Sequence, residues 1–286
     1  MSNILRVAIQ KSGRLSDDSL KLIKECGIKF NNGTGKLKSV STNFPMEFLF
    51  LRDDDIPGYV ADGVADIGIV GENVLVEKKQ EVTLEKKLGF SKCRLSLAVP
   101  KGEEYKGVEY FNGKKIATSY PVILQKYLDS KSVEAEIHEI SGSVEIAPGI
   151  GLADGICDIV SSGSTLFTNG LKEVEVIFPS EAVLIANKDL SEEKQRTLHK
   201  WLFRIDSVLE AANKKYILLN APNDSIDKII SLLPGMKSPT ILPLAEKGWS
   251  SLHSVINEDE FWEVIEQLKE VGAQGILVVP IEKMIR

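Results

Sequence analysis

The chain has 286 residues, 43% of them hydrophobic and 27% charged, which is the composition of an ordinary globular protein. At roughly 150 residues per domain, this length corresponds to about two domains and leaves room for three. A net charge of -6 excludes a general electrostatic attraction to nucleic acid or to anionic membranes. The three scattered cysteines contain no C-x-x-C pair, which argues against a disulfide framework or a zinc site. Because the N-terminal apolar stretch is too short for a signal-peptide core, we expect a cytoplasmic protein without a membrane segment.

Short strands and helices alternate in the first part of the chain, which predicts a mainly parallel sheet with helices on its faces. The first strand is expected over 5–9, and the helix after it begins with Ser16 as its N-cap and stops at Gly27. A second strand over 46–51 leads to a helix whose first turn contains Pro57. These segments are successive βα units of an α/β protein.

The pattern Ala-Asp-Gly-x-x-Asp-Ile-x-x-x-Gly occurs twice, over 61–71 and over 153–163. Both copies predict the same local structure: a helix ends at the first glycine, a buried strand starts at Asp-Ile, and the last glycine opens a new helix. Chance or a shared βαβ pattern could explain so short a repeat. The other interpretation is two similar lobes that face a cleft.

The remainder of the chain divides into three parts. A second lobe is expected to contain strands over 93–99, 115–119 and 133–140 with a helix begun by Pro121, and two more strands follow over 174–178 and 182–186. A long amphipathic helix is expected from a Ser191 cap to about Asn213. From Lys215 the pattern predicts a ferredoxin-like βαββαβ module, an appendage that more often regulates or assembles than catalyses.

The best candidate for an anion site is a hydroxyl-rich glycine turn, since neither G-x-x-x-x-G-K-[ST] nor G-x-G-x-x-G occurs. The turn consists of Ser161, Ser162, Gly163, Ser164 and Thr165, after an apolar strand and before a helix. Its backbone N–H groups would converge on an anion that the helix dipole also favours. An ordinary serine-glycine turn with an N-cap explains the same residues equally well.

Two acidic residues near this turn have two interpretations each. Asp154 could accept ribose hydroxyls or help to hold a hydrated Mg²⁺ ion, but a lone aspartate is more often a cap. Glu145 could belong to the same site or to a solvated helix face. The three successive aspartates 53–55 fit a helix N-terminus better than a metal site.

Basic residues at strand ends could supply a local positive pocket. Arg52 ends a strand, where open α/β sheets place ligands, and a guanidinium there could bind phosphate with two hydrogen bonds. Lys11 and Arg14 occupy the matching position in the first βα unit. The three histidines have no metal-ligand spacing, and no G-x-S-x-G elbow occurs, so zinc chemistry and covalent hydrolysis are not supported.

Several long segments, in order along the chain, resemble the long form of the ATP phosphoribosyltransferase family. They are IQKSGRLSDDSL, RDDDIPGYVADGVADIGIVGENVL, ATSYPVILQKYL, GSVEIAPGIGLADGICDIVSSGSTL, SPTILPLA and VVPIEKMI. The resemblance covers essentially the whole chain. It implies transfer of the phosphoribosyl group of 5-phosphoribosyl-1-pyrophosphate (PRPP) to N1 of the adenine of ATP with Mg²⁺, in the first step of histidine biosynthesis. It also implies inhibition by histidine and dimers that assemble into hexamers.

The resemblance further implies a two-lobed catalytic body like that of type II periplasmic binding proteins. Lobe I would comprise 1–90 and 180–213, lobe II 91–179, and a ferredoxin-like, ACT-like regulatory domain 215–286.

The resemblance assigns site residues as well. PRPP is expected at Asp154, Ser161, Ser162, Gly163, Ser164 and Thr165; ATP at Lys11, Arg14, Arg52, Asp66, Gly71 and Glu72; and histidine at Asn220, Ser238 and Thr240. Asp154, Glu145, Arg14 and Lys11 are the expected catalytic residues, and the metal ligands stay unassigned. Many relatives have a basic residue where this chain has Gly149, so no phosphate contact is assigned at that position.

Two alternatives stay open on the sequence. One is a cytoplasmic two-lobed sensor or binding protein without catalysis. The other is a phosphoribosyltransferase of the other major type, whose usual paired acids before a Thr-Gly turn are missing, because Asp158 is the single acid before Val160 and Ser161.

Overall fold

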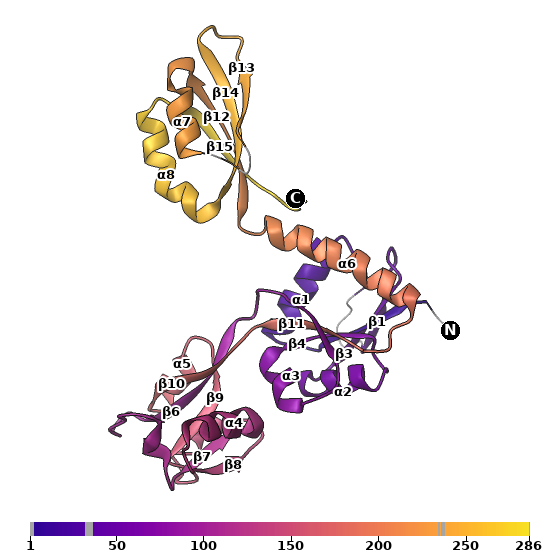
Figure 1. Ribbon diagram of the computed structural model, residues 1–286, viewed down its shortest axis with the longest axis vertical. Coiled ribbons are helices and arrows are strands. Elements are labelled where there is room, and N and C mark those ends of the chain that lie inside the picture. Colours follow the sequence, from indigo (N-terminus) through magenta and orange to yellow (C-terminus); the bar gives the residue numbers. More distant parts are fainter. Residues whose placement is uncertain (1–2, 32–36, 234, 236–237, 286) are drawn as a thin grey trace. The chain divides into compact units, whose positions relative to one another are not determined.

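The computed structural model describes residues 3–31, 37–233, 235 and 238–285, and Figure 1 shows the ribbon. The chain forms two compact units, 1–198 and 199–286. Their boundary lies inside helix α6 (Glu192–Ala211). The second half of the helix contacts the C-terminal tail, since the amide of Met284 donates to the carbonyl of Ser207 at 2.8 Å.

A six-stranded sheet organises lobe I. Its strands, in spatial order, are β2 (Lys38–Val40), β3 (Met46–Leu51), β1 (Leu5–Gln10), β4 (Ile67–Gly71), β11 (Ala182–Ala186) and β5 (Thr83–Lys87). β1 pairs in parallel with β3 and β4, whereas β11 returns from lobe II and pairs antiparallel with β4 and β5. The apolar strands that periodicity predicted thus form the buried centre of the sheet.

Three helices follow the parallel strands of lobe I: α1 (Arg14–Glu25), α2 (Ile56–Ala61) and α3 (Glu72–Lys78). Pro57 lies in the first turn of α2, as expected. The expectation that Ser16 caps α1 is wrong, because Ser16 is buried within the helix and the N-cap is Gly13. Gly13 has a φ of 99°, a conformation that glycine adopts without steric cost, and this lets the helix begin earlier.

A five-stranded sheet organises lobe II. Its strands, in spatial order, are β10 (Leu171–Ser180), β6 (Cys93–Pro100), β9 (Gly155–Val160), β7 (Lys115–Thr118) and β8 (Glu136–Glu139). Helix α4 (Pro121–Lys131) starts at the expected proline, and helix α5 (Ser164–Thr168) starts after the glycine turn. The 3-10 helices η2 (Val108–Phe111) and η3 (Val144–Ile146) complete the lobe.

The two lobes share one topology. The order β3-β1-β4-β11-β5 in lobe I matches β8-β7-β9-β6-β10 in lobe II, with three parallel strands followed by two antiparallel ones in each. The repeated segments contribute β4 and β9, which occupy equivalent central positions. The prediction of a two-lobed body like that of type II periplasmic binding proteins is therefore confirmed.

The repeat does not encode the same local structure twice, and that expectation is wrong. Gly63 follows α2 with a φ of +69°, as a helix-ending glycine does. Gly155 is the first residue of β9 instead. A Cβ at Gly155 would be 2.7 Å from Cε1 of Phe111 and 2.9 Å from the carbonyl oxygen of Ala98, so close packing requires this glycine.

The C-terminal unit contains the predicted βαββαβ order. Its elements are β12 (Lys214–Pro222), α7 (Ile226–Leu232) after the 3-10 helix η4 (Asn223–Ser225), β13 (Thr240–Pro243), β14 (Trp249–Asn257), α8 (Glu258–Glu270) and β15 (Gln274–Pro280). The sheet order is β13-β14-β12-β15 and all neighbours are antiparallel, which is the ferredoxin-like arrangement. Both helices lie on one face of this sheet and leave the other face open (Figure 1).

Candidate active site

A cavity of about 270 Å³ is lined by residues of both lobes. Gln10, Asp53 and Gly71 lie at or just beyond the carboxyl ends of β1, β3 and β4, and Ser161 lies just beyond that of β9. The carboxyl ends of parallel strands meet at one edge of a sheet, which is where open α/β proteins bind ligands. Segments that connect the lobes complete the lining with Ser91, Lys92, Cys93, Ser180 and Ala182.

The glycine turn 161–165, here called the anion loop, follows β9 directly. Gly163 has a φ of +80°, which favours glycine at this position. The hydroxyls of Ser162 and Ser164 lie 3.0 Å apart and are exposed, and Ser161 lines the cavity. The structure therefore brings Ser161 of the predicted loop to the cavity wall and leaves the hydroxyls of Ser162 and Ser164 exposed to solvent.

Cations of lobe I approach the same place. Arg14 Nη1 donates a hydrogen bond to Ser161 Oγ at 3.2 Å, and the Arg14 side chain is 66% exposed. The amide of Lys11 donates to the carbonyl of Leu51 at 2.8 Å, which places Lys11 beside the end of β3, directly before Arg52. Both side chains are exposed. Lys92, which the sequence analysis did not single out, adds a further cation to the lining.

Asp158, which the sequence analysis did not assign, lies in β9, the strand that leads into the anion loop. Burial is the main cause that raises the pKa of its carboxyl group to about 6, and the charge of Glu145 raises it further. The predicted residue Glu145, in η3, is therefore close to it. Tyr120 lies nearby as well: burial and the charges of Asp158 and Asp53 raise the pKa of its phenol. An acid inside the otherwise apolar strand GICDIV was the sequence pattern that could have identified Asp158.

Asp154 does not lie with the anion loop, which corrects its assignment to the PRPP site. It precedes β9, whereas the loop follows it, and six strand residues span roughly 20 Å. Its carboxylate accepts a hydrogen bond from the amide of Lys115 at 2.8 Å, so it caps the start of β7. The expected catalytic role of Asp154 has no support in this geometry.

Asp66 is also placed away from the cavity. It precedes β4, while Gly71 ends that strand at the cavity. Asp66 is 5% exposed and accepts hydrogen bonds from Lys194 Nζ and from the amide of Arg6, each at 2.7 Å. Its carboxylate is thus committed to internal contacts, which corrects its assignment to the ATP site.

Two buried polar residues missed by the sequence analysis support the cavity wall. Ser180 Oγ accepts a hydrogen bond from the backbone amide of Asn73 at 3.1 Å. The same hydroxyl donates to the side-chain Oδ1 of Asn73 at 2.8 Å. Both residues line the cavity. Glu72, which begins α3, binds Lys87 Nζ at 2.8 Å beside them. The two Ser180 bonds join a lobe I helix to the segment that returns from lobe II.

Mg²⁺ in proteins usually takes one or two protein carboxylates together with substrate phosphates and water. Asp158 and Glu145 lie close together, and Asp53 lines the cavity. Within the ranges that the structure describes, no three or more His, Cys, Asp or Glu side chains form a complete metal cage. The site thus fits a metal that arrives with a phosphorylated substrate.

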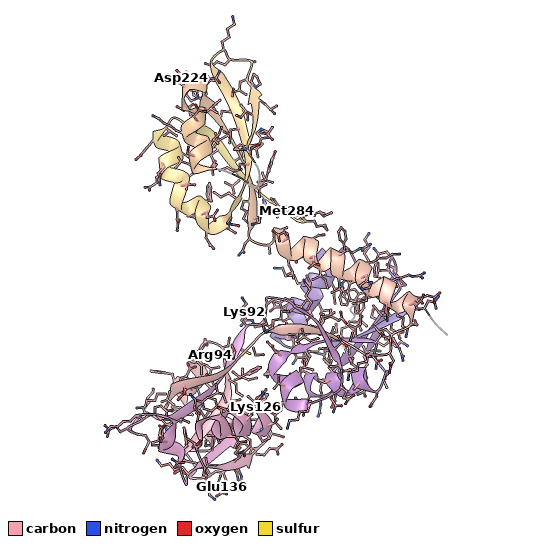
Figure 2. All side chains as sticks on the ribbon, viewed as in Figure 1. Lys92, Arg94, Lys126, Glu136, Asp224 and Met284 are labelled. Carbon is pink, nitrogen blue, oxygen red and sulfur yellow. The ribbon has the colours of Figure 1, made fainter. Side chains whose placement is uncertain are left out.

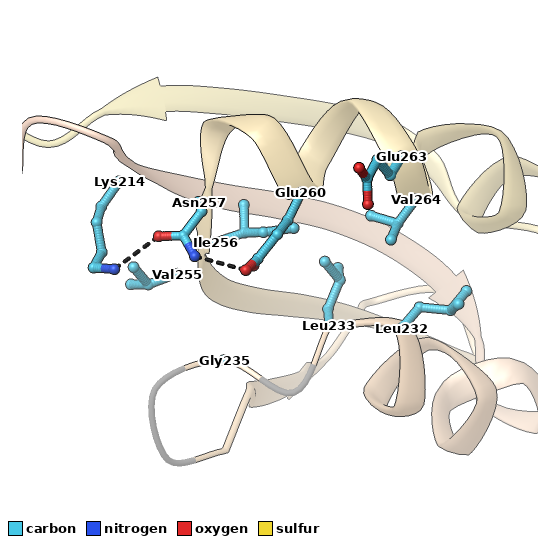
Figure 3. Close-up of a pocket in the computed structure, with 10 residues that line it drawn as sticks. All are labelled: Lys214, Leu232, Leu233, Gly235, Val255, Ile256, Asn257, Glu260, Glu263 and Val264. Atoms are coloured by element: carbon cyan, nitrogen blue, oxygen red, sulfur yellow. Dashed lines mark hydrogen bonds between the residues drawn. The ribbon is translucent and has the colours of Figure 1, made fainter. Parts of the chain in front are cut away.

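A second cavity, of about 680 Å³, lies in the C-terminal unit (Figure 3). Glu260 and Glu263 line it, and its Lys214 Nζ donates to Asn257 Oδ1 at 2.8 Å. Asn257 in turn donates to Glu260 at 2.7 Å. An acidic lining whose lysine is already engaged is a poor receptor for a triphosphate.

The residues of the C-terminal unit that are expected to bind histidine lie only partly together. Asn220 pairs with Ser251 and Thr240 pairs with His253 across the sheet, and directly paired residues share a face. Ser251 and His253 alternate with buried residues of β14, so this is the helix-free face. His253 Nε2 lies 3.1 Å from Ser251 Oγ. Ser238, two residues before β13, is exposed.

Two lobes of one topology, with a cation-lined cavity and the anion loop of lobe II at their junction, define a two-lobed α/β protein whose cavity suits phosphorylated small molecules. None of the described helices has both the length and the apolar character needed to cross a membrane.

The chain belongs to the ATP phosphoribosyltransferase family. The model of that family matches residues 52–207, and the model described as HisG, C-terminal domain, matches 211–283. ATP phosphoribosyltransferase of Cytophaga hutchinsonii is 65% identical over 286 residues and that of Parabacteroides distasonis 63% over 282, covering 99% or more of each chain. A solved ATP phosphoribosyl transferase (HisG:HisZ) complex from Thermotoga maritima aligns with a TM-score of 0.62 and 31% identity, over 72% of this chain and 99% of that chain.

This membership makes the chain a pentosyltransferase, the enzyme of the first step of histidine biosynthesis. It favours catalysis over the sensor alternative.

Proposed function

We propose that the cavity between the lobes is where PRPP and ATP react. The observation that carries this proposal is the hydrogen bond from Arg14 to Ser161, because it joins a lobe I cation to the lobe II anion loop. The loop would hold the 5′-phosphate of PRPP through its hydroxyls and backbone amides. The triphosphate of ATP would lie against lobe I, near Lys11, Arg14, Arg52, Gly71 and Glu72.

The reaction needs positioning more than acid-base chemistry. N1 of adenine attacks C1′ of the ribose with its lone pair, and the C1′–O bond to pyrophosphate breaks. N1 carries no proton, so no strong base is needed. Holding both reactants in attack geometry can lower the barrier by ~7–11 kcal/mol in favourable cases. Arg14 and Lys11 would stabilise the charge that grows on pyrophosphate.

The acidic pair Asp158 and Glu145 is assigned to the ribose and the metal. Asp158, in the strand that leads into the anion loop, would accept hydrogen bonds from the ribose hydroxyls. Either carboxylate could ligate Mg²⁺, which when bound neutralises charge on the pyrophosphate oxygens. We assign no role in this site to Asp154 or Asp66.

Initial-rate assays test the proposal. With ATP, PRPP and Mg²⁺ the protein should form the N1-substituted adduct and pyrophosphate. Ser162→Ala and Thr165→Ala should each raise the KM for PRPP. Thr168→Ala is the matched control, because its hydroxyl donates to the carbonyl of Ser164 within α5 at 3.0 Å. An unchanged PRPP KM in both loop variants would place the donor elsewhere.

Regulation by histidine is proposed for the C-terminal unit. The polar residues Asn220, Thr240, Ser251 and His253 gather on the open sheet face, where amide, hydroxyl and imidazole groups suit an amino acid.

We also propose a homo-oligomer, from dimer to hexamer, in the cytoplasm. Light scattering of the purified chain with and without histidine would report the oligomer.

A further inference from the structure

An ion pair lies beside the anion loop, at the start of β6, where Figure 2 labels Arg94. Arg94 Nε and Nη2 donate to the two carboxylate oxygens of Glu173, each at 2.5 Å. Ser96 Oγ donates to Glu173 Oε1 at 2.7 Å. The side chains of Arg94 and Glu173 are 35% and 24% exposed. A planar guanidinium held by both carboxylate oxygens has a fixed direction.

The remaining guanidinium nitrogen points to the loop. Arg94 Nη1 donates to the carbonyl oxygen of Ser161 at 3.3 Å. Ser161 is therefore held at two atoms: its carbonyl by Arg94 of lobe II, and its hydroxyl by Arg14 of lobe I. Fixing this carbonyl fixes the peptide plane that leads into Ser162, and with it the direction of the Ser162 amide.

The two arginines differ in the charge that they can offer to a substrate. Glu173 neutralises Arg94, and the guanidinium in turn lowers the pKa of the Glu173 carboxyl group. Arg14 is 66% exposed and its nearest carboxylate, that of Asp18, is 3.8 Å away. Arg14 thus remains available to a phosphate, whereas Arg94 is suited to holding the loop.

We infer that Arg94, held by Glu173 and Ser96, is a positioning residue for phosphoribosyl transfer: it fixes the Ser161 carbonyl so that loop 161–165 keeps its donor-binding orientation. The inference rests on the proposed binding of PRPP to this loop. A displacement of about 1 Å at a site can cost about 100-fold in rate, so loss of the bond should have a measurable kinetic effect.

Arg94→Lys is the sharpest variant. A lysine keeps one ion pair with Glu173, but it lacks the fork that reaches Glu173 and Ser161 together. The expected result is a PRPP KM raised about 10-fold or more, with the ATP KM within about twofold and the melting temperature near that of the wild type. Arg94→Gln should raise the PRPP KM further. Glu173→Gln, which frees Arg94, should raise it in the same direction.

Glu175→Gln is the matched control for stability. Glu175 lies two residues along the same strand and accepts hydrogen bonds from the hydroxyls of Tyr105 and Tyr127. No loop residue is among its bonded partners. Glu175→Gln should lower the melting temperature and leave the PRPP KM unchanged. If Arg94 had only a structural role, Arg94→Lys would give the same result as this control.

Two outcomes overturn the inference and can be told apart. If Ser162→Ala and Thr165→Ala raise the PRPP KM but Arg94→Lys leaves it within twofold of the wild type, Arg94 does not position the loop. If the two loop variants themselves leave the PRPP KM unchanged, the proposed donor site fails and the role of Arg94 fails with it.

Discussion

Arg14 and Ser161 are 147 positions apart, yet Arg14 Nη1 donates a hydrogen bond to Ser161 Oγ at 3.2 Å. Arg14 begins helix α1 in lobe I, and Ser161 begins the anion loop in lobe II. The contact joins an exposed cation to the hydroxyl-rich loop across the cavity. It places a lobe I guanidinium against the lobe II loop at the junction of the lobes.

Replacing Arg14 tests this contact. Arg14→Gln removes a charge-assisted hydrogen bond donor, worth about 1.5–3 kcal/mol, so the PRPP KM should rise about 10-fold to 100-fold. Stability should change by less than about 0.5 kcal/mol, because the side chain is 66% exposed. Lys21→Gln is the matched control: it lies on the same helix, is 74% exposed, and should leave the KM unchanged. A normal PRPP KM in Arg14→Gln would contradict the assignment.

Asp158 and Asp154 should respond differently to the same substitution. Asp158→Asn removes the carboxylate beside the anion loop and should lower kcat/KM for PRPP about 100-fold or more, as expected when a transition-state contact of about 3 kcal/mol is lost. Asp154→Asn weakens the contact with the Lys115 amide at the far end of β9 and should leave kcat/KM within about threefold. Initial rates over a range of PRPP concentrations decide between them. The reverse ranking would restore Asp154 to the site.

The pKa of Asp158 predicts a pH effect on stability. Burial raises this pKa from 3.8 to about 6, so the folded protein binds the proton more tightly than the unfolded chain. The stability that protonation contributes is complete below about pH 3.8 and is lost as the pH rises through about 6. Asp158→Asn should remove this loss of stability with rising pH, because asparagine does not titrate.

The measurement is the free energy of unfolding of both proteins across that pH window. As the pH rises from about 4 to 7, the free energy of unfolding of Asp158→Asn should increase relative to that of the wild type. The increase should reach up to about 3 kcal/mol, at ~1.4 kcal/mol per pKa unit. Parallel pH curves would show that the carboxyl group is not desolvated.

Glycine substitutions separate packing from backbone conformation. Gly155→Ala forces a Cβ to 2.7 Å from Phe111 and 2.9 Å from a backbone oxygen, and should cost about 1–3 kcal/mol of stability. Gly163→Ala places alanine at a φ of +80° and should cost about 1–2 kcal/mol, together with weaker PRPP binding. Gly58→Ala is the control, since nothing lies within 4 Å and a helix favours alanine by about 0.5–1 kcal/mol. Thermal denaturation of the three variants gives the order, and equal effects at all three positions would contradict it.

Histidine inhibition should depend on the open face of the C-terminal sheet. Asn220→Ala and Thr240→Val should each raise the histidine concentration for half inhibition about 10-fold, because each removes a hydrogen bond of about 1.4 kcal/mol. Uninhibited kcat should not change. Asp224→Ala, in η4 outside this face, is the control. Inhibition that stays normal in both variants would move the effector to another site.

Local patterns were sufficient for most elements. The strand over 46–51, the helix begun by Pro121 and the βαββαβ order all appear as expected, since periodicity and caps act within a few residues. The loop 161–165 was identified for the same reason: a glycine turn between strand and helix is a local feature. The cap at Ser16 and the helix end at Gly155 were wrong, because Gly13 and the packing of Phe111 overrode the local preference.

The amino-acid order by itself indicated most of the strands and helices, suggested two similar lobes, and identified the hydroxyl-rich glycine turn as a candidate anion site. The tertiary structure alone decided which charges meet there. Asp158 is favoured over Asp154 because only one end of β9 faces the cavity, and that depends on how the strands pair. Arg14 and Arg94 converge on Ser161 through contacts across 147 and 67 positions, which no local pattern encodes.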